Sequence, residues 1–302
     1  MGTANAALNV FQLLFKARVY VSISYHHILS NKLLNKWRMS FMTYKYITIE
    51  RKEHIAVVTL NRPERINALS MDLMKEIEKV TEDFQEDIDT RVVIFKGKGK
   101  HFSAGRDLAD TKHQPKTILE AQRRTHIGKR MIRKLFEMNQ ITIAAIHGSA
   151  LGGGACIVSA LDFRIGTKDC IVGYPEAVLG MSLSWASLPL CVHLIGPARA
   201  KQMVILGQKI KAQTLYEWGF LDEISTQNNL IEQAFKMANA YAAMPPIAAQ
   251  MIKKSVNAIS SALDQAIMHM DSDQVLLCHK TDDLKEGIQA FLEKRRGKYT
   301  GN

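Results

Sequence analysis

Two glycine-containing loops are the first indication of chemistry in this chain. The stretches KGKGKHFSAGRDL, residues 96–108, and ALGGG, residues 150–154, each lead from an expected strand into a loop of small residues. Small residues leave backbone N–H groups accessible, so two such loops that converge could hold one carbonyl oxygen between two donors. Such donors stabilise the oxyanion that forms when a thioester carbonyl becomes an enolate. The second loop also opens an apolar helix, whose N-terminal partial positive charge adds to the effect.

A carboxylic acid follows in GYPEAVLGM, residues 173–181, where Glu176 comes directly after Pro175. A carboxylate that is partly withdrawn from water has a raised pKa and can move protons. An isolated Pro-Glu pair is more often part of a surface turn. Glu176 is therefore a candidate only in combination with the two glycine loops.

Cys156 lies on the first turn of the helix after the glycine run, where a polar catalytic group could stand instead. An unperturbed thiol has a pKa of about 8.5, and apolar burial raises it. We therefore predict that Cys156 packs as a small buried side chain and does not act as a base.

The surrounding pattern predicts the elements that position these groups. Residues 44–60 alternate in polarity and are β-branched, which predicts two strands joined by a charged turn at residues 51–54. Ser70 is predicted to cap a helix. Residues 109–127 form a polar, basic segment, and a helix is predicted after them over GKRMIRKLFEM.

The second half of the chain continues in the same way. A strand is predicted over ITIAAIHG, residues 141–148, and two short strands over residues 162–180. From about Leu230 the chain reads as helical, with a break at Pro245 and Pro246. Strand–strand–helix units followed by a helical tail predict an α/β core with a helical C-terminal region.

Composition excludes several classes of protein. Of the 302 residues 47% are hydrophobic, yet the sequence contains no apolar run long enough to cross a membrane. The four cysteines are far apart and show no metal-ligand spacing, so we predict reduced thiols and no metal site.

The charge is unevenly distributed. Residues 1–42 contain five basic and no acidic residues, which leaves +6 of the net charge of +11 for the rest of the chain. This extension resembles an organelle presequence, or it precedes a native start at Met39 or Met42. A mitochondrial location follows if it is a presequence, and a cytoplasmic one if the protein is bacterial. The remaining charge suits a phosphate-bearing ligand, whereas no nucleic-acid motif accompanies it. The predicted domains are residues 1–42, 43–235 and 236–302.

Six motifs in order along residues 44–299 resemble the enoyl-CoA hydratase/isomerase (crotonase) family. They are NRPERINALS, GKGKHFSAGRDL, HGSALGGGACIVSALDFRIGT, GYPEAVLGM, LIGPARAKQMVILGQKIKAQTLYEWGFLDEI and FLEKRRGKY. The resemblance implies a crotonase-like spiral of ββα units with a helical C-terminal trimerisation region, and assembly into trimers or hexamers. It also implies an acyl-CoA thioester as substrate, with coenzyme A as part of that substrate and no permanently bound cofactor.

The resemblance also assigns site residues. The oxyanion-hole donors fall on the backbone N–H groups of Arg106 and Gly153, and the acid/base falls on Glu176. The CoA and acyl path is expected to be lined by Arg65, Ala104, Gly105, Asp107, Leu108, Gly152, Trp185 and Lys294.

This sequence differs from the hydratases of the family in two places, and these differences bear on the choice between isomerase and hydratase activity. Hydratases of the family use two glutamates to hold and activate a water, and the first falls on Cys156 here. SLSWASLPL, residues 182–190, replaces a segment that is usually glycine-rich, and Trp185 adds bulk to it. The preferred hypothesis is a 3,2-enoyl-CoA isomerase with a single glutamate. A hydratase in which a serine positions water, and a non-catalytic CoA- or RNA-binding trimer, remain as alternatives.

The other basic and histidine-containing features are given structural roles. The segment AQRRTHIGKRMIRK, residues 121–134, is interpreted as a solvated helix face or a lid near CoA phosphates, rather than as an RNA site. His101 and His147 flank the two loops and are interpreted as structural. His113 and His126 lie in a variable lid region, and no role is assigned to them.

Overall fold

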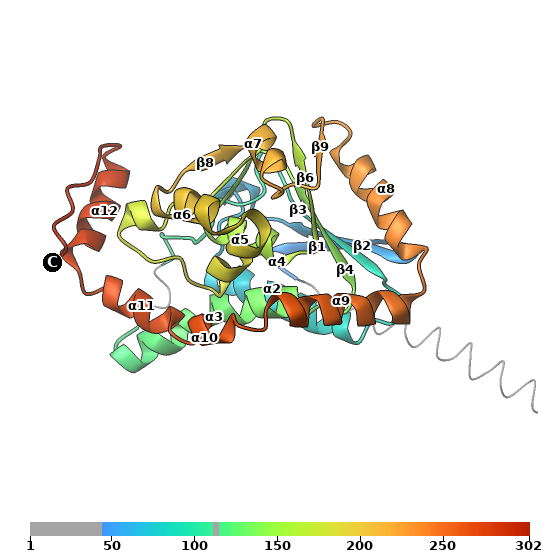
Figure 1. Cartoon of the computed structure of the whole chain (residues 1–302), viewed down its shortest axis with the longest axis horizontal. Coiled ribbons are helices and arrows are strands. Elements are labelled where there is room, and N and C mark those ends of the chain that lie inside the picture. The colour runs from blue at the N-terminus through green and yellow to red at the C-terminus, as the bar shows by residue number, and fades with distance from the viewer. Residues whose placement is uncertain (1–43, 111–114) are drawn as a thin grey trace, which may run out of the picture. The chain divides into compact units, whose positions relative to one another are not determined.

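The computed structural model describes residues 44–110 and 115–302. The fold presented below is that of the unit Lys45–Asn302 (Figure 1). The predicted extension, residues 1–42, and His113 lie outside the described residues. Within the described part of the chain, no helix is both long and apolar enough to span a bilayer.

A six-stranded sheet forms the centre of the fold, in the order β1-β2-β3-β4-β6-β9. The first two strands are antiparallel and turn at Glu53 and His54, which confirms the predicted pair. The other neighbours are parallel. The strands are β1 (Ile47–Lys52), β2 (Ile55–Leu60), β3 (Val92–Gly97), β4 (Ile141–Ile146), β6 (Phe163–Thr167) and β9 (Glu223–Ser225).

A smaller sheet has the order β5-β7-β8. Two of its strands directly follow strands of the large sheet along the chain. The strand β5 follows β4 within three residues and leads into α4, and β7 follows β6. Two strands in different sheets followed by a helix are the predicted strand–strand–helix unit. The bounds are β5 (Ser149–Leu151), β7 (Ile171–Gly173), β8 (Lys209–Lys211) and α4 (Gly153–Ala160).

Helices cover the large sheet. The small residues Ala234, Ala238 and Ala242 of α8 (Leu230–Ala242) pack on the apolar side chains of β2, β3, β4 and β6. The intervening residues of these strands, such as Val58 and Val93, are buried as well, so both faces are covered. The other helices of the core are α2 (Met71–Gln85), α3 (Ile118–Phe136), α5 (Ser187–Ile195), α6 (Pro197–Ile205) and α7 (Ala212–Glu217).

The ends of α2 and α3 follow from their capping residues. Ser70 caps α2 as predicted, because its hydroxyl accepts the N–H of Leu73 at 3.2 Å. Thr117 caps α3 in the same way, by accepting the N–H of Glu120 at 3.1 Å. The prediction of a helix only after residue 127 is therefore wrong, because α3 already begins at Ile118.

The C-terminal region is helical, as predicted, and lies along the lower and left sides of the core in Figure 1. The chain breaks at Pro245 and continues as α9. Farther on, α11 lies against α3, and α12 lies against the short 3-10 turn η2 (Ala177–Leu179). The bounds are α9 (Pro246–Ser260), α10 (Gln265–Met268), α11 (Asp271–Cys278) and α12 (Asp282–Leu292).

A buried ion pair attaches α9 to the sheet. The ammonium group of Lys253 lies 2.6 Å from Asp162 Oδ2 and donates a hydrogen bond to the carbonyl of Gln140 at 2.7 Å. The same carboxylate accepts the N–H of Thr142 at 2.8 Å. Lys253 is only 7% exposed, so the removal of one partner leaves a buried charge without compensation.

Replacing Lys253 by alanine is expected to lower the free energy of unfolding by about 3 kcal/mol. Lys254→Ala is the matched control, because Lys254 is the next residue of the same helix and is exposed. Urea denaturation of both variants measures the difference. Equal stability of the two variants would show that the ion pair does not anchor α9.

Candidate active site

The two glycine loops converge because β3 and β4 are parallel neighbours, so the segments that follow them emerge at the same edge of the sheet. Backbone hydrogen bonds then join the segments. Phe102 N–H donates to the carbonyl of His147 and Ser103 N–H to that of Ser149, each at 3.0 Å, while Leu151 N–H donates to the carbonyl of Ser103 at 3.0 Å. The predicted convergence is therefore built by main-chain contacts.

The direction of the Arg106 N–H group follows from the hydrogen bonds of the backbone groups next to it. The backbone groups on either side of it form hydrogen bonds with Leu69. The carbonyl of Gly105 accepts the N–H of Leu69 at 2.7 Å, and Asp107 N–H donates to the carbonyl of Leu69 at 3.1 Å. The carbonyl of Gly105 and the N–H of Arg106 belong to one trans peptide group, in which C=O and N–H point in opposite directions. The N–H of Arg106 therefore faces away from Leu69.

The second donor, Gly153, is the first residue of α4, where helix geometry leaves N–H groups without an intrahelical acceptor. Within the described residues, neither Gly153 N–H nor Arg106 N–H donates a hydrogen bond. A Cβ on Gly105 would lie 2.5 Å from the carbonyl oxygen of Leu151 and 3.1 Å from the nitrogen of Gly153. Gly105, with φ of +87°, thus brings the two donor segments into contact.

Glu176 stands beside this pair of donors, at the start of η2. A Cβ on Gly152, where φ is +51°, would lie 2.9 Å from Glu176 Oε1, so the glycine makes room for the carboxylate. Its Oε2 atom is buried and has no hydrogen-bond partner among the described residues. Burial raises the pKa of Glu176 from 4.5 to about 7. A carboxyl group with that pKa can both accept and return a proton near neutral pH.

Cys156 is 2% exposed and lines the same pocket as Glu176. Burial is the main reason why the pKa of the thiol lies well above its ordinary value, and the nearby charge of Glu176 adds to the shift. A hydrogen bond with Ser187 opposes the shift only in part. The thiol is therefore neutral at physiological pH, in agreement with the expectation that it is not a base.

A pocket of about 490 Å³ contains these groups. Arg106, Gly153, Cys156 and Glu176 all line it, and so do the predicted residues Asp107, Leu108 and Trp185. The loop after β3 and helix α3 contribute its charged side chains. Residues 181–185, α11 and α12 form an apolar wall, with Leu183, Val275, Leu276, Leu284 and Ile288.

Three of the predicted binding residues lie elsewhere. Arg65 ends the short 3-10 turn Pro63–Arg65 and is exposed, and Ala104 is also exposed. Lys294 lines a separate groove of about 470 Å³ between α12 and the C-terminal segment. Gly105 and Gly152 shape the loops but do not line the pocket.

The histidines that flank the loops hold backbone in place. His147 Nε2 donates to the carbonyl of Gly99 at 3.0 Å, and His101 Nδ1 accepts the N–H of Ser149 at 3.1 Å. Burial lowers the pKa of His147. These contacts support the structural interpretation of both residues. His126 is exposed on α3.

Sequence reasoning did not single out His279, and it considered Ser182 and Arg124 only within longer segments, residues 182–190 and 121–134. The hydroxyl of Ser182 is buried without a partner among the described residues. Burial and the nearby positive charge of Arg106 lower the pKa of His279. Arg124 and His279 come from α3 and from the residue after α11, and no spacing in the sequence indicates that these segments face the loops.

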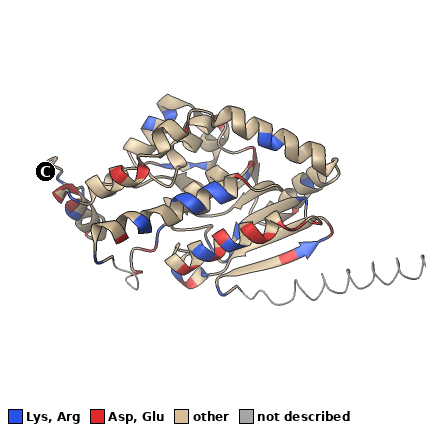
Figure 2. Ribbon diagram, turned by 90° about the horizontal axis from the view of Figure 1, so that it is seen from below, with Lys and Arg blue, Asp and Glu red and all other residues tan. Residues whose placement is uncertain are grey.

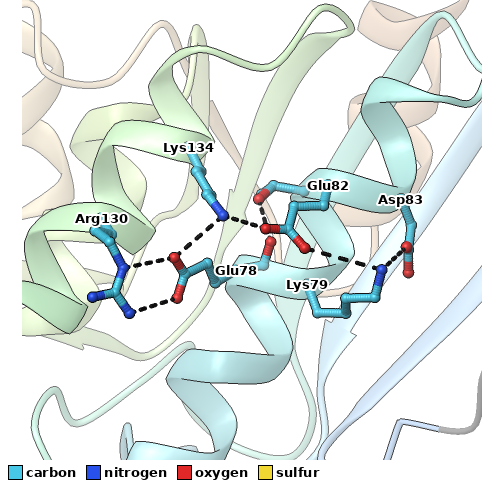
Figure 3. A network of polar contacts seen from close by, with 7 residues as sticks. Glu78, Lys79, Glu82, Asp83, Arg130 and Lys134 are labelled. Carbon is cyan, nitrogen blue, oxygen red and sulfur yellow. Dashed lines mark hydrogen bonds and ion pairs between the residues drawn. The ribbon is translucent and has the colours of Figure 1, made fainter.

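The basic segment of α3 is engaged in ion pairs with α2 (Figure 3). Arg130 Nε donates to Glu78 Oε1 at 2.9 Å, and Lys134 bridges Glu78 and Glu82. Figure 2 shows blue and red segments close together on two neighbouring helices. This part of α3 is therefore a neutralised helix face, which does not favour binding of nucleic acid. No group of three or more His, Cys, Asp or Glu side chains among the described residues could hold a metal ion.

The geometry defines a class of protein: an α/β fold with paired backbone donors, one buried carboxylate and a deep pocket. A sequence profile of the enoyl-CoA hydratase/isomerase family matches residues 50–302. The chain belongs to this family, as its motifs predict.

Known proteins support this assignment. A crotonyl-CoA hydratase from Syntrophomonas wolfei is 32% identical over 85% of this chain and 99% of its own length. A 1,2-epoxyphenylacetyl-CoA isomerase from Escherichia coli is 26% identical over 72% of this chain and 84% of its own length. The crystal structure of an enoyl-CoA hydratase/isomerase from Xanthobacter autotrophicus superposes with a TM-score of 0.76 at 26% identity, covering 84% of this chain and 98% of that one. The predicted crotonase-like fold is thus confirmed.

Proposed function

We propose that the chain is an acyl-CoA enzyme of the 3,2-enoyl-CoA isomerase type, with Glu176 as its single acid/base. The observation that carries this proposal is the pairing of Glu176 with Cys156 in one pocket. Glu176 has a pKa of about 7, whereas the thiol stays neutral where a hydratase of the family would place a second carboxylate.

The proposed reaction needs one proton carrier and no added water. The thioester oxygen accepts hydrogen bonds from the N–H groups of Arg106 and Gly153. Glu176 takes a proton from C2 of a 3-enoyl-CoA, and the electron pair of that C–H bond delocalises into a dienolate whose oxyanion the two donors stabilise. The protonated Glu176 then returns its proton to C4, so the double bond ends between C2 and C3 and the enzyme is regenerated.

A hydratase is the second candidate, and the hydroxyl of Ser182 favours it. This buried oxygen lines the pocket and lacks a partner among the described residues, so it could hold a water for Glu176 to activate. The names of several relatives also point to hydration, since they are called hydratases.

We further propose that coenzyme A enters as part of the substrate and that no cofactor is bound permanently. The side chains of Arg106 and Arg124 line the pocket together with the carboxylates of Asp107 and Asp110, and the two guanidinium groups are proposed to contact phosphate groups of the ligand. Arg65 and Lys294 lie outside the pocket and are proposed to contact the phosphates at its rim or in a neighbouring subunit.

Assembly into a trimer or a hexamer is proposed from an exposed face of α9. Six apolar side chains on and after this helix are 56–82% exposed: Ile247, Met251, Ile252, Val256, Ile259 and Leu263. An apolar face of this extent is typical of a surface that another subunit covers. The molar mass in solution distinguishes three copies from six.

The isomerase proposal predicts a specific pattern of products in heavy water. A 3-enoyl-CoA is expected to become a 2-enoyl-CoA and to gain deuterium, because Glu176 exchanges its proton with solvent during transfer. A 2-enoyl-CoA is expected to gain no water. Mass spectrometry of both reactions measures the outcome. Addition of water to the 2-enoyl substrate at the same rate as isomerisation would support the hydratase instead.

A further inference from the structure

The indole of Trp185 is inserted between two glycines. A Cβ on Gly128 of α3 would lie 2.2 Å from Trp185 Cε2, and a Cβ on Gly153 would lie 2.4 Å from Trp185 Cζ3. Since real Cβ atoms do not approach so closely, any other residue at either position would displace the ring. The two glycines therefore form a slot for the indole, and one wall of this slot is an oxyanion donor residue.

The backbone around the indole is held in an unusual conformation. Trp185 and Ala186 have φ of +62° and +58°, a region that residues other than glycine rarely adopt. The N–H of Ala186 donates to Asp271 Oδ2 at 2.5 Å, and Asp271 is only 5% exposed. Lys129 of α3 also donates to the carbonyl of Met268, just before α11. Helix α11 thus holds the backbone of the turn through Asp271, while α3 provides Gly128 beside the indole and is itself joined to the end of α10.

The position of the ring determines which part of a substrate would meet it. Glu176 occupies the space that a Cβ on Gly152 would need, and the indole occupies the space that a Cβ on the next residue, Gly153, would need. An acyl group that brings its thioester oxygen to Gly153 N–H and its C2 to Glu176 therefore lies close to the indole. The apolar side chains of Leu183 and Val275 line the same pocket.

We infer that Trp185 determines acyl-chain specificity by closing the pocket beyond the first few carbons, and that Asp271 is a positioning residue that holds the indole there. The preferred substrates are then short, unbranched acyl-CoA thioesters. This inference rests on the proposed function, because it takes the pocket to bind an acyl-CoA.

The test compares four-carbon and ten-carbon ligands in two assays. Isothermal titration with saturated butanoyl- and decanoyl-CoA measures binding without chemistry, and turnover of the matching 3-enoyl-CoA esters measures kcat and KM separately. The wild-type protein is expected to prefer the four-carbon ligand. Trp185→Ala is expected to shift the preference towards the ten-carbon ligand by about tenfold or more, since each methylene in an apolar pocket changes discrimination on that scale.

Two further variants and a control distinguish a change in chain-length preference from a non-specific loss of structure or binding. Asp271→Ala is expected to relax the length preference as Trp185→Ala does, whereas Asp271→Asn retains an acceptor for Ala186 N–H and is expected to restore it. Trp218→Ala removes the same side chain from a site outside the pocket and is expected to leave the preference unchanged. If Trp185→Ala does not fold, Trp185→Phe is expected to give a smaller shift in the same direction.

The outcomes distinguish this inference from the proposed function. A length preference in binding that Trp185→Ala relaxes, without turnover of any ester, would support the role of Trp185 and overturn the proposed reaction. An unchanged preference in the Trp185 variants, with turnover intact, would overturn the inference alone. Absence of binding by either acyl-CoA would overturn both.

Discussion

Glu176→Gln is expected to lower kcat/KM for a 3-enoyl-CoA by about 10³-fold, because the amide can neither take the C2 proton nor return it to C4. Glutamine has nearly the size of glutamate, so the pocket and the two backbone donors should persist. Glu64→Gln is the matched control, since Glu64 is exposed on the short 3-10 turn Pro63–Arg65. Steady-state kinetics of both variants test the assignment. A wild-type value of kcat/KM in Glu176→Gln would show that Glu176 is not the acid/base of the reaction.

The pH dependence of the wild-type protein provides a second test of the same residue. In the proposed reaction the ionised carboxylate takes the first proton, and burial raises its pKa to about 7. The value of kcat/KM is therefore expected to rise with pH and to level off above about pH 8. One pH unit below the pKa it is expected to be about tenfold lower than the plateau value. An unchanged rate down to pH 5 would show that the carboxylate ionises at its ordinary pKa.

Stability should change in the opposite direction. The folded pKa of Glu176 is raised above the ordinary 4.5, so between pH 4.5 and 7 the folded state binds more protons than the unfolded state. The stability contributed by the neutral form is fully present below pH 4.5 and is lost as pH rises through 7. An ionised Glu176 therefore costs about 3 kcal/mol above pH 7, and Glu176→Gln should be more stable than the wild-type protein at pH 8 but similar at pH 4. Such a trade of stability against activity is typical of a catalytic group.

The loops that carry the donors were predictable from the sequence because their geometry is local. Strands of β-branched residues precede both loops, and glycines stand where the backbone needs positive φ, as at Gly105 and Gly152. Strands β3 and β4 are neighbours in a parallel sheet, which brings their following segments to one edge. Ordinary rules for α/β folds therefore place the two donor segments together.

The pocket wall was not predictable in the same way, because contacts distant in the sequence build it. Trp185 is recognisable as bulky, but its slot depends on Gly128 and its backbone on Asp271, which lies 86 residues farther along the chain.

The early start of α3 is a different case. Thr117 followed three residues later by Glu120 is a helix-start signal that is visible in the sequence, and the polarity of the segment concealed it.

Cys156→Glu is expected to create hydratase activity, because it places a second carboxylate in the pocket that contains Glu176 and the two proposed oxyanion donors, Arg106 and Gly153. Two carboxylates can hold a water between them, so that one takes its proton while the other returns a proton to the dienolate or enolate carbon. The interaction of two nearby acids also separates their pKa values, which gives one acid and one base. Hydration of a 2-enoyl-CoA should rise by about 10²-fold over the wild-type rate, as measured by mass gain of the product.

The matched control for this gain is Cys156→Gln, which adds the same volume to the buried site without a charge. A gain in the glutamate variant alone would assign hydration to the second carboxylate. A gain in both variants would instead attribute it to altered space in the pocket, and the role given to Cys156 would be wrong. Rapid hydration by the wild-type protein would also contradict the role given to Cys156. It would show that hydration proceeds with a neutral thiol of raised pKa beside Glu176. In that case the buried hydroxyl of Ser182 becomes the group that positions the water, and Ser182→Ala should abolish hydration while leaving isomerisation in place.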